Sequence, residues 1–203
     1  MSSRGVLIVV SGPSGSGKGT LLRELQREND RIRYSVSATT RPPREGEVDG
    51  VNYFFVTKQE FQQKIDKGEM LEFTSYCGNY YGTPRDYVYK NLDEGYDVIL
   101  EIDVVGALKL MEHGEQAVYI FIMPPSMQEL KKRLVGRNTE PEDVINRRLE
   151  TALQEIQSAD KYDYIVVNDV IDTAIEKLKA IILCHKCKTV NMKYKIKEVL
   201  TDA

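Results

Sequence analysis

A glycine-rich segment directly after a short apolar run constrains the fold of this chain more than any other feature. Residues 6–10 read VLIVV, and residues 11–20 read SGPSGSGKGT, with four glycines and one lysine in ten positions. An apolar run without polar alternation predicts a strand that is buried on both faces, as in a parallel sheet. Apolar residues at helical spacing predict a helix from residue 19. Strand, glycine turn and helix in this order open an α/β fold.

The glycine segment also has the spacing of a phosphate-binding loop. Residues 12–18 match G-x-x-x-x-G-K between a predicted strand and a predicted helix. Glycines let consecutive backbone N–H groups point at phosphate oxygens, the helix N-terminus adds a positive partial charge, and Lys18 adds a full one. The alternative is a glycine-rich turn that binds nothing. We predict that phosphates are bound by Gly12, Pro13, Ser14, Gly15, Ser16, Gly17, Lys18, Gly19 and Thr20, and the resemblance described below implies that they belong to ATP.

The residue after the lysine, where a serine or threonine commonly binds Mg²⁺, is Gly19 in this chain. The ending G-K-G-T at residues 17–20 is similar to that of nucleoside monophosphate kinases. On this resemblance, we assign the hydroxyl ligand for Mg²⁺ to Thr20, with Ser16 as the alternative.

Strand-like and helix-like segments alternate along most of the remaining chain. Apolar runs that predict strands lie at 97–103, 117–123 and 162–169. Amphipathic spacing predicts helices at 84–92, 105–112, 126–135, 141–159 and from 171 onward. This alternation predicts a parallel sheet with helices on both faces, the core of a P-loop protein.

One segment, 37–83, breaks this alternation. Short aromatic-rich strands are predicted there at 51–56, 70–76 and 79–83, around a helix at 58–67. This composition indicates a mixed or antiparallel lobe inserted into the core. A second insertion, 126–158, is helical and highly charged. We expect three parts: a core at 1–36, 84–125 and 159–203, a lobe at 37–83 and a lid at 126–158.

Composition excludes several classes of protein. The 203 residues carry a net charge of −3, so no overall basic field attracts nucleic acid or an anionic membrane. No stretch approaches the roughly 20 apolar residues of a membrane span, and the first apolar run is too short for a signal peptide. Three cysteines, an odd number, fit a reducing cytosol. We expect a cytoplasmic protein whose partners include neither nucleic acid nor a membrane.

A cysteine pair near the end of the chain has the spacing of half a zinc site. Cys184 and Cys187 flank a histidine and a lysine, but the sequence offers no second cluster of ligands, and Cys77 and His113 are isolated. Structural zinc takes four ligands. We therefore expect a helix that carries these residues, with a metal site as the alternative.

The segment 37–53, SATTRPPREGEVDGVNY, places two arginines three residues apart. Two prolines separate Arg41 from Arg44, stiffen the loop and exclude a helix. Guanidinium groups bind phosphate in a bidentate manner, so a rigid pair suits a terminal monophosphate. Tyr53 and Tyr81 can add hydroxyl donors to the same group. A pair of solvated surface arginines is the alternative.

The order and spacing of these motifs resemble the guanylate kinase family. The matching segments begin with SGPSGSGKGT and continue with S-x-T-T-R-x-P-R-x-G-E-x-x-G-x-x-Y-x-F, LE (71–72), GNYYGT, LEID, R-L-x-x-R and VND. They cover nearly the whole chain. The resemblance implies an ATP:GMP phosphotransferase with a P-loop NTPase core, a GMP-binding lobe and a lid. It also implies Mg²⁺ with ATP, and GMP and dGMP as acceptors, while the oligomeric state stays open, a homodimer included.

For the guanine base, the resemblance implies contacts from Glu72 and Ser37, with the hydroxyl of Thr83 nearby. Guanine carries donors at N1 and N2 and acceptors at O6 and N7, so a carboxylate can accept from one edge and a hydroxyl can donate to the other. Adenine has no donor at N1, and a carboxylate there would face a lone pair. For the GMP phosphate, the resemblance implies Arg41, Arg44, Tyr53 and Tyr81, with Glu47 orienting the arginines.

Two carboxylates, Glu101 and Asp103, stand two residues apart at the end of a predicted strand. Side chains at this spacing share one side of a strand, and ligands of open α/β sheets bind beyond the carboxyl ends of the strands. We expect one carboxylate to organise Mg²⁺ through water and the other to contact the acceptor nucleoside, as the resemblance also implies. An acidic surface pair is the alternative.

The charged insertion carries arginines at helical spacing. Arg133 and Arg137 lie four apart, where like charges tolerate each other better with an anion between them. The resemblance implies that these two and Arg148 close over the ATP phosphates, and that Asn168 contacts the adenine. Asn138 stands where the family commonly has glycine. An ordinary charged surface helix pair is the alternative. The predicted catalytic residues are Lys18, Arg41, Asp103, Arg133, Arg137 and Arg148.

Two other functions remain open on the sequence. Some domains that resemble guanylate kinases in scaffold proteins have lost catalysis and bind phosphopeptides, but they typically lose the phosphate loop and the lid, which this sequence retains. The second alternative is a kinase for another small phosphorylated acceptor on the same scaffold.

The loop assignment predicts that Lys18→Ala lowers kcat by at least about 100-fold, because the transferred phosphate loses a preorganised positive charge. Steady-state turnover of ATP with GMP measures the loss, and an unchanged circular dichroism spectrum shows that the fold is intact. Wild-type turnover of a folded variant would contradict the assignment.

Overall fold

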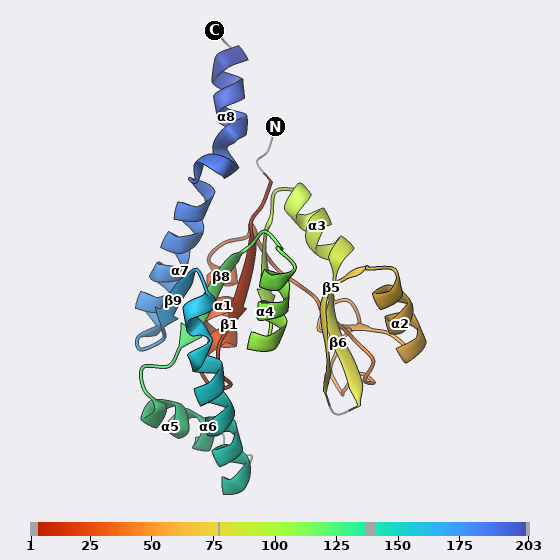
Figure 1. The fold of residues 1–203 in the computed structure, drawn as a ribbon, viewed down its shortest axis with the longest axis vertical. Helices are drawn as coiled ribbons and strands as arrows, with labels where there is room; N and C mark the ends of the chain where they lie inside the picture. Colours follow the sequence, from red (N-terminus) through yellow and green to blue (C-terminus); the bar gives the residue numbers. More distant parts are fainter. Residues whose placement is uncertain (1–3, 77, 137–140, 202–203) are drawn as a thin grey trace.

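The computed structural model describes residues 4–76, 78–136 and 141–201, which form an α/β core with a smaller lobe beside it (Figure 1). Within these residues the core sheet has five parallel strands in the order β2-β7-β1-β8-β9. Their bounds are β1 Leu7–Ser11, β2 Ile32–Tyr34, β7 Asp97–Glu101, β8 Val118–Met123 and β9 Tyr164–Val167. The predicted fold class, a parallel sheet flanked by helices with a second mixed sheet, is confirmed.

Strand β1 lies in the middle of the core sheet and is buried along its whole length. Its alternate residues pack on opposite faces, with Ile8 and Val10 in one apolar cluster and Leu7 and Val9 in the other. Helices cover both faces, which is why the strand shows no polar alternation. The covering helices are α1 Lys18–Arg27 and α7 Ile171–Lys186 on one face, and α3 Arg85–Asp93 and α4 Val104–Glu112 on the other.

The smaller lobe contains a mixed four-stranded sheet in the order β4-β3-β6-β5. Strand β3 pairs in parallel with β4, whereas β6 runs antiparallel to both β3 and β5. One helix packs on this sheet through Phe61, which is buried and stacks on Tyr80 with ring centroids 5.3 Å apart. The bounds are β3 Ala38–Thr39, β4 Phe54–Phe55, α2 Lys58–Asp66, β5 Met70–Tyr76 and β6 Asn79–Pro84.

Several elements depart from the sequence-based expectations. The strand expected at 51–56 is limited to two residues, because a turn that includes Gly50 at φ +74° precedes it. Strands β2 and β3 escape prediction, since three and two residues are too few to show a periodicity. The helix expected from residue 171 ends at Lys186, and a separate helix, α8 Thr189–Thr201, follows it.

Helix α8 extends outward from the body (Figure 1). None of its residues is buried, and its link to α7 includes a hydrogen bond from the amide of Asn191 to the carbonyl of His185 at 2.8 Å. Cys184 and Cys187 are exposed around the end of α7. Among the described residues, no helix combines the length and the hydropathy that a bilayer span requires.

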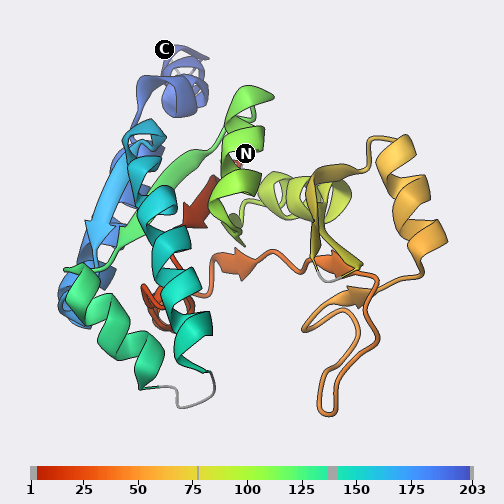
Figure 2. The ribbon, with the colours of Figure 1, turned by 60° about the horizontal axis from the view of Figure 1, so that its bottom comes forward.

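Two charged helices, α5 Met127–Val135 and α6 Glu142–Gln157, form a pair on the side of the core opposite the lobe (Figure 2). They pack together through an apolar cluster that includes Leu130 and Leu134. The same leucines reach the glycine loop, since a Cβ on Gly15 would lie 3.0 Å from Leu134 Cδ2 and 3.1 Å from Leu130 Cδ1. The helix pair therefore rests on the loop.

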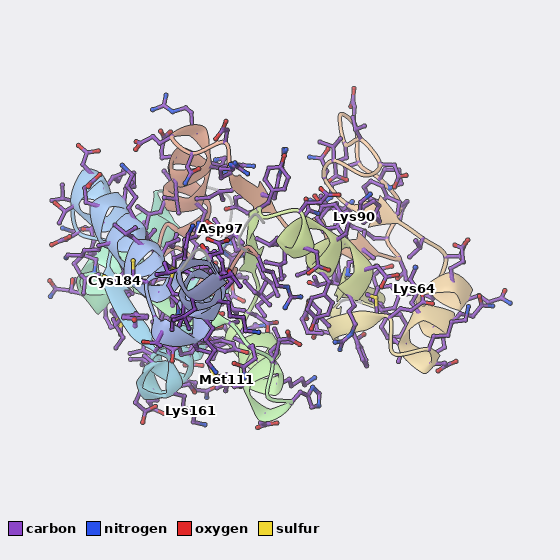
Figure 3. All side chains as sticks on the ribbon, turned by 90° about the horizontal axis from the view of Figure 1, so that it is seen from above. Lys64, Lys90, Asp97, Met111, Lys161 and Cys184 are labelled. Carbon is purple, nitrogen blue, oxygen red and sulfur yellow. The ribbon has the colours of Figure 1, made fainter. Side chains whose placement is uncertain are left out.

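A buried carboxylate ties together three parts of the core. Asp97, whose side chain is 1% exposed, begins strand β7 and lies inside the body (Figure 3). Its Oδ1 accepts a hydrogen bond from the backbone N–H of Val6 at 3.0 Å, and its Oδ2 lies 2.5 Å from Nζ of Lys186. Burial of a carboxylate is tolerated only with such partners.

Removing this carboxylate is expected to destabilise the fold. We expect Asp97→Ala to lower the free energy of unfolding by about 2–3 kcal/mol, because it leaves the N–H of Val6 unsatisfied and Lys186 without its partner. Asp97→Asn keeps an acceptor for the N–H and is expected to lose less. Urea denaturation measures both variants. Equal stability of Asp97→Ala and the wild type would show that the contact contributes nothing.

Candidate active site

The loop between β1 and α1 requires glycine at three positions. Gly12, Gly15 and Gly17 have φ angles of +147°, +90° and +91°, values that residues with side chains rarely adopt. Space is also lacking, since a Cβ on Gly12 would lie 2.3 Å from the carbonyl oxygen of Ile122. Helix α1 begins at Lys18, so the positive end of its dipole lies at the loop.

A cavity of about 290 Å³ opens at this loop. Its lining residues are Ser14, Gly15, Gly17, Lys18, Gly19, Thr20, Arg23 and Glu101. The ammonium group of Lys18 donates to the carbonyl of Gly12 at 2.6 Å and to that of Pro13 at 3.1 Å, so it lies across the loop. Three of the predicted loop residues do not line this cavity and are buried: Gly12, Pro13 and Ser16.

Two arginines of the helix pair contact the loop or its support. Arg133 on α5 donates from Nη2 to the carbonyl of Asn168 at 3.0 Å and from Nη1 to that of Ser16 at 3.5 Å. Arg148 on α6 donates from Nη1 to Oγ of Ser14 at 3.5 Å. These contacts place both guanidinium groups beside the predicted phosphate site. Outside the described residues lie Arg137, Asn138 and Cys77, which the sequence also singles out.

Asn168 lies directly after β9, at the end of the last core strand as expected, and contacts the glycine loop. It is 5% exposed, and its Nδ2 donates to the carbonyl of Ser16 at 2.8 Å. The contact is close, since a Cβ on Gly17 would lie 2.3 Å from the same Nδ2. The side-chain amide is therefore buried against the loop backbone, and the adenine contact that the resemblance implies stays a prediction.

A second cavity, of about 170 Å³, lies between the lobe and the core. It brings together predicted acceptor residues, namely Ser37, Tyr53, Glu72, Tyr81, Glu101 and Asp103. Thr74 also lines it and is missing from the predicted set. It stands two residues from Glu72 on β5 and therefore on the same face of the strand, a signal that the sequence does carry.

Glu72 is a buried carboxylate in this second cavity, at 8% exposure. Thr83, its cross-strand neighbour on β6, donates its hydroxyl to Oε1 of Glu72 at 2.8 Å. Burial raises the pKa of Glu72 to about 7; the Thr83 hydroxyl opposes the rise, and the nearby charge of Asp103 adds to it. Thr83 therefore positions the carboxylate, and a ligand that brings donors to it favours the ionised form.

The side chain of Arg41 is fixed from several directions. Its Nη1 and Nη2 each donate to the carboxylate of Glu47 at 2.6 Å, and its guanidinium lies 5.0 Å from the ring centroid of Tyr53 and 5.6 Å from that of Phe55. Glu47 also accepts from the backbone N–H of Arg44 at 2.7 Å, and these hydrogen bonds lower the pKa of Glu47 to about 2. Glu47 thus orients the Arg41 side chain and the Arg44 backbone, while the Arg44 side chain is exposed.

The two carboxylates at the end of β7 are arranged differently from the expectation. The strand ends at Glu101, and Asp103 is the N-cap of α4, where it accepts from the N–H of Gly106 at 2.7 Å. Asp103 therefore lies outside the strand, and the two-residue repeat of a strand does not place the two side chains on one side. Both still line the second cavity, and Glu101 also lines the first. The hydroxyl of Tyr34 donates to Glu101 at 3.4 Å, a contact without local sequence signal because it joins residues 67 positions apart.

The protein itself offers few ligands for a metal ion. Across residues 4–76, 78–136 and 141–201, no group of three or more His, Cys, Asp or Glu side chains is placed to hold one. The cavity at the glycine loop does contain the hydroxyl residue Thr20 and the carboxylate residue Glu101. This donor set suits Mg²⁺, which keeps several waters and is held largely by phosphate oxygens.

Known proteins resemble this chain over most of its length. The family model described as "Guanylate kinase" matches residues 4–184. The guanylate kinase of Halalkalibacterium halodurans is 54% identical over 185 residues, 91% of this chain and 91% of that protein. The guanylate kinase of Shouchella clausii is 51% identical over 197 residues, 97% and 96% of the two chains. A crystal structure of guanylate kinase from Anaplasma phagocytophilum superposes with a TM-score of 0.71 at 38% identity, over 93% of this chain and 89% of that one.

The raised pKa of Glu72 predicts a stability that depends on pH. The carboxyl keeps its proton up to about pH 7 in the folded state but only to about 4.5 when unfolded, so the free energy of unfolding is expected to fall as the pH rises between these values. Glu72→Gln lacks this loss and is expected to gain about 2–3 kcal/mol relative to the wild type over that range.

Urea denaturation at about pH 5 and about pH 8 measures this difference. Glu45→Gln, which removes an exposed carboxylate from the same lobe, is the matched control. A gap between Glu72→Gln and the wild type that stays constant with pH would contradict the shifted titration.

Proposed function

The chain belongs to the guanylate kinase family, the ATP:GMP phosphotransferases, and we propose that its two cavities hold the two nucleotides of that reaction. ATP binds at the glycine loop, GMP binds in the lobe, and the products are ADP and GDP. The observation that carries this assignment is the shared wall of the two cavities, since Glu101 lines both. A phosphate bound in one cavity can therefore face an acceptor in the other.

On the donor side, we assign the phosphates of ATP to the loop N–H groups and to Lys18. The helix dipole, the ammonium group and the arginines of the helix pair all favour an anion at this point. Arg133 and Arg148 already lie beside the loop. With Arg137, predicted from the family pattern, they would neutralise the charge that spreads over the transferred phosphate.

Mg²⁺ is the metal ion that we propose for the donor site. The hydroxyl of Thr20 would hold it directly and Glu101 through water, while phosphate oxygens supply most of its ligands. When bound, the ion would supply positive charge that offsets the negative charge of the phosphates.

On the acceptor side, we assign guanine recognition to Glu72 and Ser37. An ionised Glu72 accepts from N1–H and N2–H₂ of guanine, whereas adenine would place a lone pair against it. Its pKa of about 7 means that binding of these donors also draws the carboxyl into its charged form. Thr83 keeps the carboxylate oriented through the 2.8 Å hydrogen bond.

For the GMP phosphate, we assign Arg41 and Arg44, with hydroxyl donors from Tyr53 and Tyr81. Arg41 needs little reorganisation to bind an anion, because Glu47 and two aromatic rings already hold its guanidinium. The transfer itself requires no protein nucleophile, since in-line positioning and charge neutralisation lower the barrier. Asp103, fixed as a helix N-cap, contributes a carboxylate beside the acceptor nucleoside.

The lobe and the helix pair lie on opposite sides of the core (Figure 2). Approach of the two would bring the donor and acceptor phosphates into line and exclude water, so that ATP is not hydrolysed. The division into core, lobe and lid is part of this proposal.

Two finer features complete it. We propose dGMP as a second acceptor, because the assigned contacts use the base and the phosphate rather than the sugar. A cytoplasmic location and a homodimer remain predictions. The alternative of a phosphopeptide-binding domain without catalysis is disfavoured by the preserved glycine loop and its lysine.

A coupled assay of ADP release tests the function. Wild-type protein is expected to turn over ATP with GMP and dGMP, and with AMP or UMP at least about 100-fold less efficiently. Glu72→Gln is expected to lose most of the discrimination between GMP and AMP, mainly through a higher KM for GMP, because a neutral amide presents a donor to guanine N–H groups. Glu45→Gln is the control. Unchanged discrimination in Glu72→Gln would refute the base contact, and no turnover with GMP would refute the function.

A further inference from the structure

The backbone of the glycine loop is supported from one side by a side chain that has no place in the transfer reaction itself. Asn168 is 5% exposed and bonds the main chain of the loop. We propose that Asn168 is a positioning residue, which sets the peptide between Ser16 and Gly17 so that the N–H of Gly17 points at a phosphate. This inference rests on the proposed use of the loop cavity for ATP.

The geometry of a peptide group carries the first step. The group is planar and trans, so its C=O and N–H point in opposite directions. The carbonyl of Ser16 accepts from Nδ2 of Asn168 at 2.8 Å. With the carbonyl held on that side, the N–H of Gly17 points to the other. Gly17 is part of the wall of the loop cavity. Preorganised N–H groups of this kind stabilise developing negative charge without reorganisation.

The placement of Asn168 by the sheet carries the second step. Its N–H donates to the carbonyl of Met123 on β8 at 2.8 Å, which continues the pairing of β8 with β9 past the end of the strand. Its own carbonyl accepts from Arg133 at 3.0 Å. The N–H of Asn168 is thus bonded to the sheet and its carbonyl to the side chain of Arg133, and together they fix the residue. The loop backbone is therefore oriented from the core sheet.

The absence of a side chain at Gly17 fits this contact. A Cβ at that position would lie 2.3 Å from Nδ2 of Asn168, and the φ angle of +91° excludes most other residues as well. Glycine is therefore required at position 17 for two reasons: it leaves room for the amide of Asn168, and it allows the positive φ angle of the turn. The side chain of Arg133 supports the same loop backbone, since it donates to the carbonyl of Ser16 at 3.5 Å and to that of Asn168 at 3.0 Å.

Asn168→Asp is the sharpest test, because it keeps the shape but replaces the donor by an acceptor that repels the carbonyl of Ser16. Affinities for ATP and for inorganic tripolyphosphate, each with Mg²⁺, are measured by calorimetry. Both are expected to fall at least about tenfold, since a buried polar pair is broken. A protonated carboxyl can donate again, so the ratio to the wild type is expected to recover toward one as the pH falls to about 5.

The two ligands separate a loop effect from a base contact. A loss confined to ATP would overturn the proposal, because tripolyphosphate carries no adenine; undiminished affinity for both ligands would overturn it as well. The matched control is Asn91→Asp, where Nδ2 of Asn91 bonds the carbonyl of Tyr87 at 2.7 Å on α3. It is expected to leave both affinities unchanged.

A second variant covers the case in which Asn168→Asp does not fold. Asn168→Ala removes the donor without adding a charge. It is expected to lower the affinities for both ligands in parallel, by a smaller factor than Asn168→Asp. Because tripolyphosphate binding involves no acceptor, a protein that fails to phosphorylate GMP would still give an interpretable result, and failure of the inference can be distinguished from failure of the proposed function.

Discussion

The need for glycine in the loop between β1 and α1 is the constraint on which the arrangement of the site depends. The loop joins the most deeply buried strand, β1, to the first helix, so its ends are fixed by the core. Gly15 admits Leu130 and Leu134 of the helix pair, and Gly17 admits Asn168. The glycines thus let the core and the helix pair reach the loop backbone, in addition to allowing its positive φ angles.

The second cavity, which we assign to the acceptor, depends on a different interaction, the burial of a carboxylate. Glu72 is buried at a cost that raises its pKa to about 7, and a ligand that supplies hydrogen-bond donors relieves that cost. Arg41, in contrast, is charged and oriented before any ligand binds, because Glu47 and the neighbouring rings hold its guanidinium. The lobe therefore combines a buried carboxylate, which we assign to the base, with a preset cation, which we assign to the phosphate, and Glu101 lines the cavities on both sides.

Much of the fold follows from periodicity, and the exceptions have identifiable reasons. The buried run of β1 and the alternation after residue 84 predict a parallel sheet, because helices on both faces remove any polar alternation. Strands β2 and β3 are stabilised by pairing with distant strands, so their own few residues carry no pattern. Asp103 departs from the strand period because capping α4 satisfies an N–H that a strand would not offer.

By itself, the sequence determined the glycine loop after the first strand, the class of fold and the candidate side chains for two nucleotides, since these depend on local spacing and on residue chemistry. Tertiary structure alone decided which groups those side chains contact. The hydroxyl of Thr83 donates to the carboxylate of Glu72, and the side-chain amide of Asn168 donates to the carbonyl of Ser16, 152 positions away. Such pairings arise when separate strands and helices pack into one body, and a hydrogen bond between distant residues leaves no mark on the spacing of either.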